Sequence, residues 1–525
     1  MPQRIEALDV SIEELEQLVD CAGQGPLPTE GQRKLKAAVA TLGVMAAMLA
    51  DKDTTIRKLR ELLTPTRTTE KTKKVLGSDA PGQEPQPKAA RRKKGHGRNG
   101  PGAYTGARKV RVAHPAMKRA DHCPGCRKGK LYPLNEPKRL IRLIGQAPVE
   151  ATVYELDALR CNLCGEVFTA PPPAGVGTEK YDASAVGMIA LLKYGSGIPF
   201  YRLQKLESDL GIPLAPATQW QLVAEAAATL APVEEELLRQ AAQGSLVHND
   251  DTSMRILSYE REAGDARTGM FTSGVVSIVA GRRVAAFFTG SKHAGENLAD
   301  VLRRRAKELA PPIQMCDALS RNVPAAFAVM LSNCMAHARR HFVDVVNSFP
   351  AECRYVLETL RGVFHFDALA KEQALSPQAR LIFHQHNSQP LMEGLHVWCK
   401  QQFEERKVEP NSGLGKAIQY LLNHWPELTL FLREPGAPLD NNVCERALKK
   451  AILHRKNALF YRTINGASVG DLFMTLIHTA ELGGVNPFDY LTELLRHPSE
   501  LAKSPARWMP WNYRENLDQK ADLAA

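Results

Sequence analysis

The first patterned segment is a series of apolar residues spaced seven positions apart, at Leu35, Leu42, Leu49, Ile56 and Leu63. This spacing is typical of a coiled-coil seam. Lys52 and Asp53 fall where a second apolar stripe should lie, and Gly43 weakens the helix. An amphipathic helix packed on its own domain therefore competes with a dimer-forming coiled coil. We assign 1–66 to a helical, zipper-like segment.

Helical patterning returns in 176–240, where two short helices are expected on either side of a turn at 209–213. A helix, a glycine-containing turn and a second helix are compatible with a helix-turn-helix that reads DNA. Any small helical bundle has the same pattern, so both interpretations stay open.

The period of the pattern then changes to that of strands. Ranges 245–257, 268–280 and 283–289 are rich in β-branched residues, and a helix over 296–309 and a short strand ending at Asp317 follow. This order fits a ribonuclease-H-like α/β core, whose first part we place at 241–345.

A helical insertion is predicted next, because Glu445 lies 128 positions after Asp317, too far for a direct return to the sheet. We place the insertion at 346–436, the second part of the core at 437–490 and a C-terminal tail at 491–525. A helix is also expected at 321–330, with Asp317 as a conceivable N-cap before it. The fold class is multidomain α+β.

Charge is concentrated in one segment. The formal net charge is +11, and between positions 85 and 120 there are 11 Lys or Arg and no acid. We interpret 67–110 as a basic disordered linker that contacts nucleic acid, with a merely solubilising linker as the alternative. The proposed DNA contacts in it are Arg91, Arg92, Lys93, Lys94 and Arg98.

Four of the ten cysteines form two CxxC pairs, Cys123 with Cys126 and Cys161 with Cys164. Two-residue spacing lets both thiolates of a pair reach one ion, and a redox motif would instead come singly. We predict a structural zinc ribbon over 111–175.

No membrane span is expected, because the longest apolar stretch, 37–50, is shorter than the roughly 18–20 residues that a span requires. No secretory signal is visible. We expect a cytoplasmic protein.

Three acids define the candidate chemistry, namely Asp250, Asp317 and Glu445. A few carboxylates suffice to hold two metal ions about 4 Å apart for cutting a phosphodiester. Magnesium (or manganese) suits such oxygen ligands. Neighbouring strand residues face opposite ways, so only one of Asp250 and Asp251 can join the site, and we choose Asp250.

Glu445 lies on a predicted helix whose N-cap is Asp440. The simpler alternative role of Glu445 is a surface ion pair with Lys449. Lys449, Arg455 and Lys456 lie along the same basic helix and are predicted to hold phosphates. His337 is a candidate neighbour of the site.

The segments HNDDTS, QMCDALSRN, CMAHARRHF, PLDNNVCERALKKAILHRKNALF and GVNPFDYLTELL together resemble the insertion sequence 66 family of bacterial transposases. The resemblance extends over most of the chain. Many members carry Glu where Asp251 stands, and Thr before the second acid with Gly and Tyr after it, where this chain has Cys316, Ala318 and Leu319.

The resemblance implies a DDE transposase in which Asp250, Asp317 and Glu445 bind magnesium. Its reaction would be hydrolysis at the ends of the element, followed by attack of the freed 3′-hydroxyl on target DNA. Implied partners are double-stranded DNA, further copies of the chain and accessory proteins of the element, in the bacterial cytoplasm and associated with the nucleoid. The alternatives are a non-catalytic DNA-binding regulator derived from a transposase and a simple nuclease.

Overall fold

The computed structural model describes residues 28, 30–32, 34–35, 115–122, 124, 126–132, 147–160, 162, 167–177, 179–259 and 267–524. Nearly all of the zipper-like segment, the basic linker and three of the four paired cysteines lie outside these residues. The described chain separates into two compact units. One contains 337–368 and 387–422, and the other contains 369–386, 423–524 and the described residues between 115 and 336.

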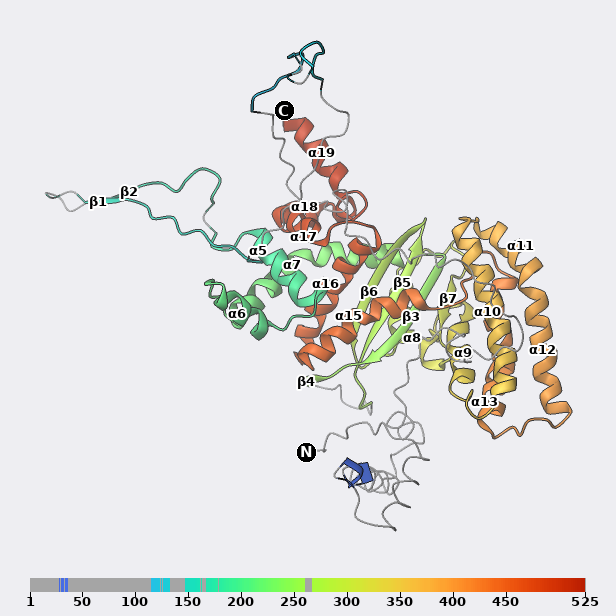
Figure 1. Cartoon of the computed structure of the whole chain (residues 1–525). Coiled ribbons are helices and arrows are strands. Elements are labelled where there is room, and N and C mark those ends of the chain that lie inside the picture. The colour runs from blue at the N-terminus through green and yellow to red at the C-terminus, as the bar shows by residue number, and fades with distance from the viewer. Residues whose placement is uncertain are drawn as a thin grey trace. The chain divides into compact units, whose positions relative to one another are not determined.

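The larger unit is built on a five-stranded sheet in the order β6-β5-β3-β7-β8 (Figure 1). β5 is antiparallel to both β3 and β6, whereas β7 is parallel to both β3 and β8. The strands are β3 (Leu246–Ser253), β5 (Phe271–Val279), β6 (Arg282–Gly290), β7 (Ile313–Cys316) and β8 (Met330–Asn333). Two-stranded sheets are formed by β1 (Ala158–Arg160) with β2 (Val167–Thr169), and by β4 (Ile256–Ser258) with β9 (Tyr461–Thr463).

The strands predicted at 268–280 and 283–289 and the short strand before Asp317 are confirmed as β5, β6 and β7. The strand predicted at 245–257 is divided, because β3 ends at Ser253 and residues 256–258 form β4, which pairs with β9 in a separate sheet. The segment after Asp317 is not the expected helix. It forms a single 3₁₀ turn, η3 (Ser320–Asn322), and then the fifth strand β8. β8 has only four residues, and the apolar run AAFAVML at 325–331, which leads into it, has no alternation that would mark a strand. Pairing with β7 determines this strand.

Helices cover both faces of the sheet. α15 (Asn442–Ala458) packs over Gly274 of β5, since a Cβ there would lie 3.1 Å from Leu448. On α8 (Ala294–Leu302), Asn297 donates to the hydroxyl of Ser273 over 2.8 Å. Because neighbouring strand residues point to opposite faces, α15 and α8 lie on opposite sides of β5.

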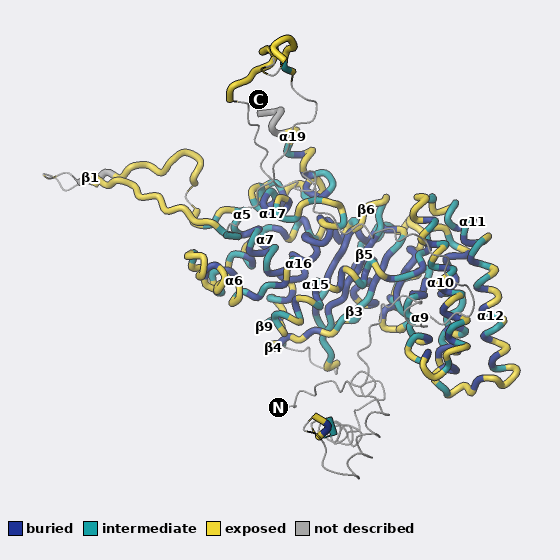
Figure 2. Tube along the Cα trace, viewed as in Figure 1, coloured by how far each residue is buried: buried dark blue, intermediate teal, exposed yellow. Residues whose placement is uncertain are grey.

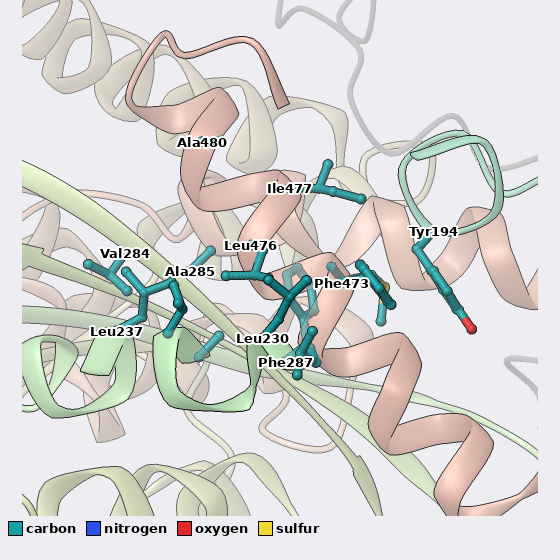
Figure 3. Close-up of a cluster of buried hydrophobic side chains, with 14 of the residues drawn as sticks. Tyr194, Leu230, Leu237, Val284, Ala285, Phe287, Phe473, Leu476, Ile477 and Ala480 are labelled. Atoms are coloured by element: carbon teal, nitrogen blue, oxygen red, sulfur yellow. The ribbon is translucent and has the colours of Figure 1, made fainter. Parts of the chain in front are cut away.

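The main core joins elements distant in sequence. Figure 3 shows Leu230 of α7 (Pro216–Ala241) beside Phe287 of β6 and Phe473 of α16 (Ile464–Leu482), and Leu237 of α7 belongs to the same cluster. In Figure 2 the strands β5 and β6 and the helix α16 are largely buried, while α6 (Phe200–Asp209) is largely exposed. The same core includes residues of α5 (Ala183–Ala190), the π-helix η2 (Leu191–Gly195), α17 (Pro487–Arg496), α18 (Pro498–Lys503), η5 (Pro505–Trp508) and α19 (Tyr513–Ala524).

The turn predicted at 209–213 lies between α6 and α7. The second helix is longer than expected, because α7 continues for 26 residues and buries Val223 and Leu230 in the main core. DNA reading by this pair stays a prediction.

The helix α16 lies along β6, which is an edge strand of the sheet. The amides of Ala285, Phe287 and Thr289 donate to three α16 side chains, over distances of 2.6–3.2 Å, namely Thr479, Thr475 and Asp471 in that order. Two residues advance about 6.7 Å along a strand, and four residues advance about 6 Å along a helix. The two periods nearly match, so one helix face supplies an acceptor to every second residue of the edge.

The smaller unit is helical, as expected for the insertion. Tyr355 of α10 (Pro350–Glu372) packs on Trp398 of α12 (Gln389–Glu404), with ring centroids 5.0 Å apart. His341 of α9 (Met335–Val343) packs on Tyr420 of α13 (Gly413–Asn423). In the larger unit, Gln385 of α11 (Pro377–Asn387) donates to the carbonyl of Leu432 in η4 (Leu430–Leu432), which follows α14 (Trp425–Leu428).

Across the residues that the structure describes, no helix combines the length and the apolar character needed to cross a bilayer.

Candidate active site

Asp250 and Asp317 are brought together by two neighbouring parallel strands. His248 of β3 pairs with Met315 of β7. Asp250 comes two residues later on β3, and Asp317 comes two residues after Met315, directly after β7 ends. Parallel strands end at the same edge of a sheet, so the two acids lie side by side there. Both are half-buried.

Glu445 reaches the same place from α15. Asp250 pairs across the sheet with Gly274 of β5, and directly opposite residues point to one face. A Cβ at Gly274 would meet Leu448 and Cys444 of α15, so Asp250 points toward this helix. Glu445 is in the first turn of α15, next to Cys444.

The charges of the three carboxylates act on one another. The pKa of Asp250 is raised to about 7, first by burial and then by the negative charges of Asp317, Asp251 and Glu445. Like charges in one place disfavour the ionised form. The arrangement therefore favours a bound cation that would relieve this repulsion.

Three buried thiols border the carboxylates. Burial and the charges of Asp317 and Asp250 raise the pKa of Cys316, and burial with Asp250 and Glu445 raises that of Cys444. The third, Cys334, has its sulfur within 4.8 Å of a carboxylate oxygen of Glu445 and accepts the Asn441 amide at 3.3 Å. The raised pKa values keep the Cys316 and Cys444 thiols protonated, and protonated thiols are poor metal ligands. The carboxylate oxygens of the three acids and the sulfur of Cys334 are the remaining candidate ligands.

Asp317 is held by the turn that follows it. The side-chain amide of Asn322 donates to Asp317 Oδ1, and the Leu319 amide donates to the same oxygen over 3.3 Å. The alternative interpretation of Asp317, as the N-cap of a helix at 321–330, is wrong because that helix does not form. The carboxylate is instead fixed within its own loop.

The start of α15 is anchored by Asn441, which is fully buried. Its Nδ2 donates to the carbonyl of Asn249 over 3.0 Å, and its Oδ1 lies 3.0 Å from Nδ1 of His248. Burial lowers the pKa of His248 to about 4, so the ring is neutral. These contacts tie the helix that carries Glu445 to the strand that carries Asp250.

The predicted cap of α15 is therefore displaced by one residue. Asn441, not Asp440, is the N-cap, and Asp440 accepts the Asn442 amide over 3.1 Å. Sequence reasoning singled out Glu445 but assigned no role to Asn441 or Asn322. The paired asparagines in LDNNVCER were the available signal, since buried amides are typical of polar networks.

A family model described as "Transposase IS66 family" matches residues 179–469, more than half of the chain. The chain belongs to this family. The matched range runs from the helical segment before the sheet into the first part of α16, and it includes all three acids.

Two relatives from Sinorhizobium fredii (strain NBRC 101917 / NGR234) are similar over most of this transposase-family chain. The uncharacterized protein y4jD is 27% identical over 385 residues, which cover 67% of this chain and 71% of y4jD. The uncharacterized protein y4hP is 25% identical over 436 residues, which cover 77% of this chain and 75% of y4hP.

Asp251 of this IS66-family chain faces away from the three acids. It pairs with Ser273 across the sheet, on the α8 side. Its carboxylate lies 2.8 Å from Nδ1 of His293 and 3.3 Å from Nη2 of Arg321. The choice of Asp250 over Asp251 agrees with this geometry.

The predicted phosphate contacts on α15 are differently placed. Lys449 and Lys456 are exposed, whereas Arg455 donates to Thr252 Oγ1 over 3.1 Å and to Ser253 Oγ over 2.7 Å, at the end of β3. Their contact with DNA stays a prediction. The five basic residues of the linker lie outside the described residues, and His337 belongs to the smaller unit, so its place beside the acids stays a prediction too.

Two observations bear on the predicted zinc ribbon. Cys126 Sγ accepts the Gly129 amide over 3.4 Å, an arrangement suited to a metal-binding turn. The second cysteine pair lies in the sequence between two antiparallel strands. β1 ends at Arg160, and β2 begins at Val167. Cys123, Cys161 and Cys164 themselves lie outside the described residues.

Proposed function

We propose that this chain is a DNA transposase that cleaves DNA at the ends of its insertion element and joins the freed 3′-hydroxyl to target DNA. Asp250, Asp317 and Glu445 would be its catalytic, metal-binding residues. The observation that carries the proposal is the meeting of these acids at one sheet edge, from two parallel strands and α15.

The sheet supports this function. Three antiparallel strands followed by two parallel ones, in the order β6-β5-β3-β7-β8, are the arrangement expected of a ribonuclease-H-like core. In that arrangement the first acid is on the central strand, the second follows the fourth strand and the third is on a later helix. The positions of Asp250, Asp317 and Glu445 fit this scheme.

Magnesium or manganese fits the residues present better than a soft metal would. The three carboxylates offer the hard oxygen ligands that magnesium and manganese prefer. When bound, such ions activate the attacking oxygen and stabilise the leaving one.

The protein's own part is to hold the acids in position. Asn322 and the Leu319 amide fix the orientation of Asp317. Asn441 fixes the start of α15 and thereby Glu445. Cys444, Leu448 and Ala451 are buried, so water is excluded from the side of α15 that faces the sheet. Electrostatic interactions of the carboxylates are stronger next to such an apolar layer than in water.

The remaining parts would serve DNA binding and assembly. We assign DNA contact to Arg91, Arg92, Lys93, Lys94 and Arg98 in the linker and to Lys449, Arg455 and Lys456 on α15. Cys123, Cys126, Cys161 and Cys164 would hold zinc. Further copies of the chain, joined through the zipper-like segment, and accessory proteins of the same element are the proposed protein partners.

The deciding experiment is cleavage of a duplex that carries the element's own ends, with Mg²⁺ or with EDTA. The wild type should nick the end only with the metal, and Asp250→Ala, Asp317→Ala and Glu445→Ala should abolish nicking while leaving DNA binding nearly intact. A matched control is Asp440→Ala, which removes a neighbouring acid outside the triad.

Cleavage that survives any of the three triad substitutions would refute the assignment. Tight binding without cutting by the wild type would favour the DNA-binding regulator or a missing accessory protein. Nicked products without joined products would favour a simple nuclease.

A further inference from the structure

The α8 side of the sheet end holds a second polar cluster that the three acids do not use. Its centre is Asp251, whose side chain is only 2% exposed. The carboxylate contacts His293, the N-cap of α8, on one oxygen and Arg321 of η3 on the other. A buried carboxylate between two basic groups is a rigid support, because each of its oxygens has a directed partner.

Arg321 points from this support into solvent. Its side chain is 45% exposed, and its guanidinium lies 5.9 Å from the ring centroid of Phe271, which also packs on His293 at 4.2 Å. Within the part of the chain that the structure describes, the hydrogen bond that Arg321 makes runs from its Nη2 to the carboxylate of Asp251. A guanidinium has five N–H donors, so most of them face outward.

The loop that carries Arg321 also carries the second acid. Arg321 follows Asp317 by four positions, a span of at most about 14 Å. The next residue, Asn322, donates to Asp317, and its carbonyl accepts from Asn249 over 2.7 Å and from Gln314 over 2.6 Å. Arg321 therefore precedes a residue whose hydrogen bonds tie this loop both to Asp317 and to the strands β3 and β7.

We propose that Arg321 binds a backbone phosphate of the DNA strand that is cleaved, next to the bond that lies at the three acids. Asp251 and His293 are positioning residues for Arg321. This inference rests on the proposed function. Three clustered carboxylates repel a phosphate, and a planar guanidinium on the loop that carries Asp317 supplies a bidentate partner for a strand that approaches them.

The first test measures binding of the full-length chain to a duplex of the element's end, in Ca²⁺, over a series of salt concentrations. Losing one phosphate contact lowers the magnitude of the slope of log K against log [salt] by about 0.9. Arg321→Ala should show this loss. Arg303→Ala is the matched control, since it removes an exposed arginine (69% exposed) at the other end of α8 and should leave the slope unchanged.

The second test measures cleavage with Mg²⁺. Arg321→Lys keeps the charge but not the planar fork, so it should retain the binding slope and lose cleavage. Asp251→Asn should likewise keep the slope while cleavage falls, because a misplaced contact can cost about 10²-fold in rate. Asp251→Glu restores a carboxylate and should recover part of that loss. Thermal unfolding of each variant checks that it is folded.

The outcomes separate the two proposals. An unchanged slope in Arg321→Ala, with a wild type that binds DNA, overturns the role of Arg321 and leaves the proposed function standing. Equal cleavage by Asp251→Asn and the wild type overturns the positioning role. A wild type that binds no DNA overturns the proposed function and this inference together.

Discussion

The protonation of a single side chain, Asp250, links the site to pH. Its pKa is raised from 3.8 to about 7, so the folded chain binds this proton more tightly than the unfolded chain does. The free energy of unfolding contributed by this residue is then greatest below about pH 4 and declines up to about pH 7.

We expect Asp250→Asn to flatten that decline when no divalent ion is present. Denaturant unfolding of both proteins across this pH range measures it. Asp471 and Glu234, whose pKa values burial raises to about 7 and about 8, are present in both proteins and cancel in the difference. An identical pH dependence in the two would contradict the predicted proton on Asp250.

Gly274 sets how closely α15 approaches the sheet. A Cβ there would stand 3.1 Å from two atoms of the buried Leu448 and 3.5 Å from Cys444 Sγ. Gly274→Ala should therefore push the helix outward, lower the free energy of unfolding by about 1–3 kcal/mol and slow cleavage, because Glu445 moves with the helix.

Equilibrium unfolding and the cleavage rate measure this effect. Gly290→Ala is the control, because a Cβ at Gly290 meets no atom within 4 Å. A Gly274→Ala variant as stable and as active as the control would show that the contact is not tight.

At the level of elements, the placement of α15 depends on one buried amide. Asn441→Ala would leave the Asn249 carbonyl and His248 Nδ1 without their partner, at a cost of about 1–3 kcal/mol. Cleavage should fall with stability, since Glu445 follows Asn441 by one helical turn. Asn442→Ala, at the exposed neighbouring position, should change neither quantity, and equal effects of the two substitutions would disprove the anchoring role.

Sequence patterns were sufficient to locate the strands and helices that bury one face, because their apolar residues alternate or repeat with the helical period. The strands β3, β5 and β6 and the helices of the insertion could be located because their side chains repeat with the period of the structure. β8 could not, because its four residues are specified by pairing with β7 rather than by their own pattern.

The candidate site divides in the same way. Three acids could be named from their strand and helix contexts. The asparagines that hold them, Asn322 and Asn441, could not, because each bonds to residues brought near only by folding. Arg321 was likewise hidden within a range expected to be helical.

For the whole molecule, zinc content is a direct test of the predicted ribbon. The purified chain should contain about one zinc ion per molecule, as four cysteine ligands would give, and Cys161→Ser should lose it. Elemental analysis measures the content, and Asp317→Ala, which leaves the cysteines unchanged, should keep its zinc. Zinc retained by Cys161→Ser at the wild-type level would exclude that residue as a ligand.

The helix α16 along β6 limits how copies of this chain can associate. An exposed edge strand is a template on which another chain can add a strand. Here the amides of Ala285, Phe287 and Thr289 already have acceptors on α16. A second copy would have to displace a whole buried helix before its backbone could join the sheet at this border, so any contact between copies there would be made by side chains and not by a continuous sheet.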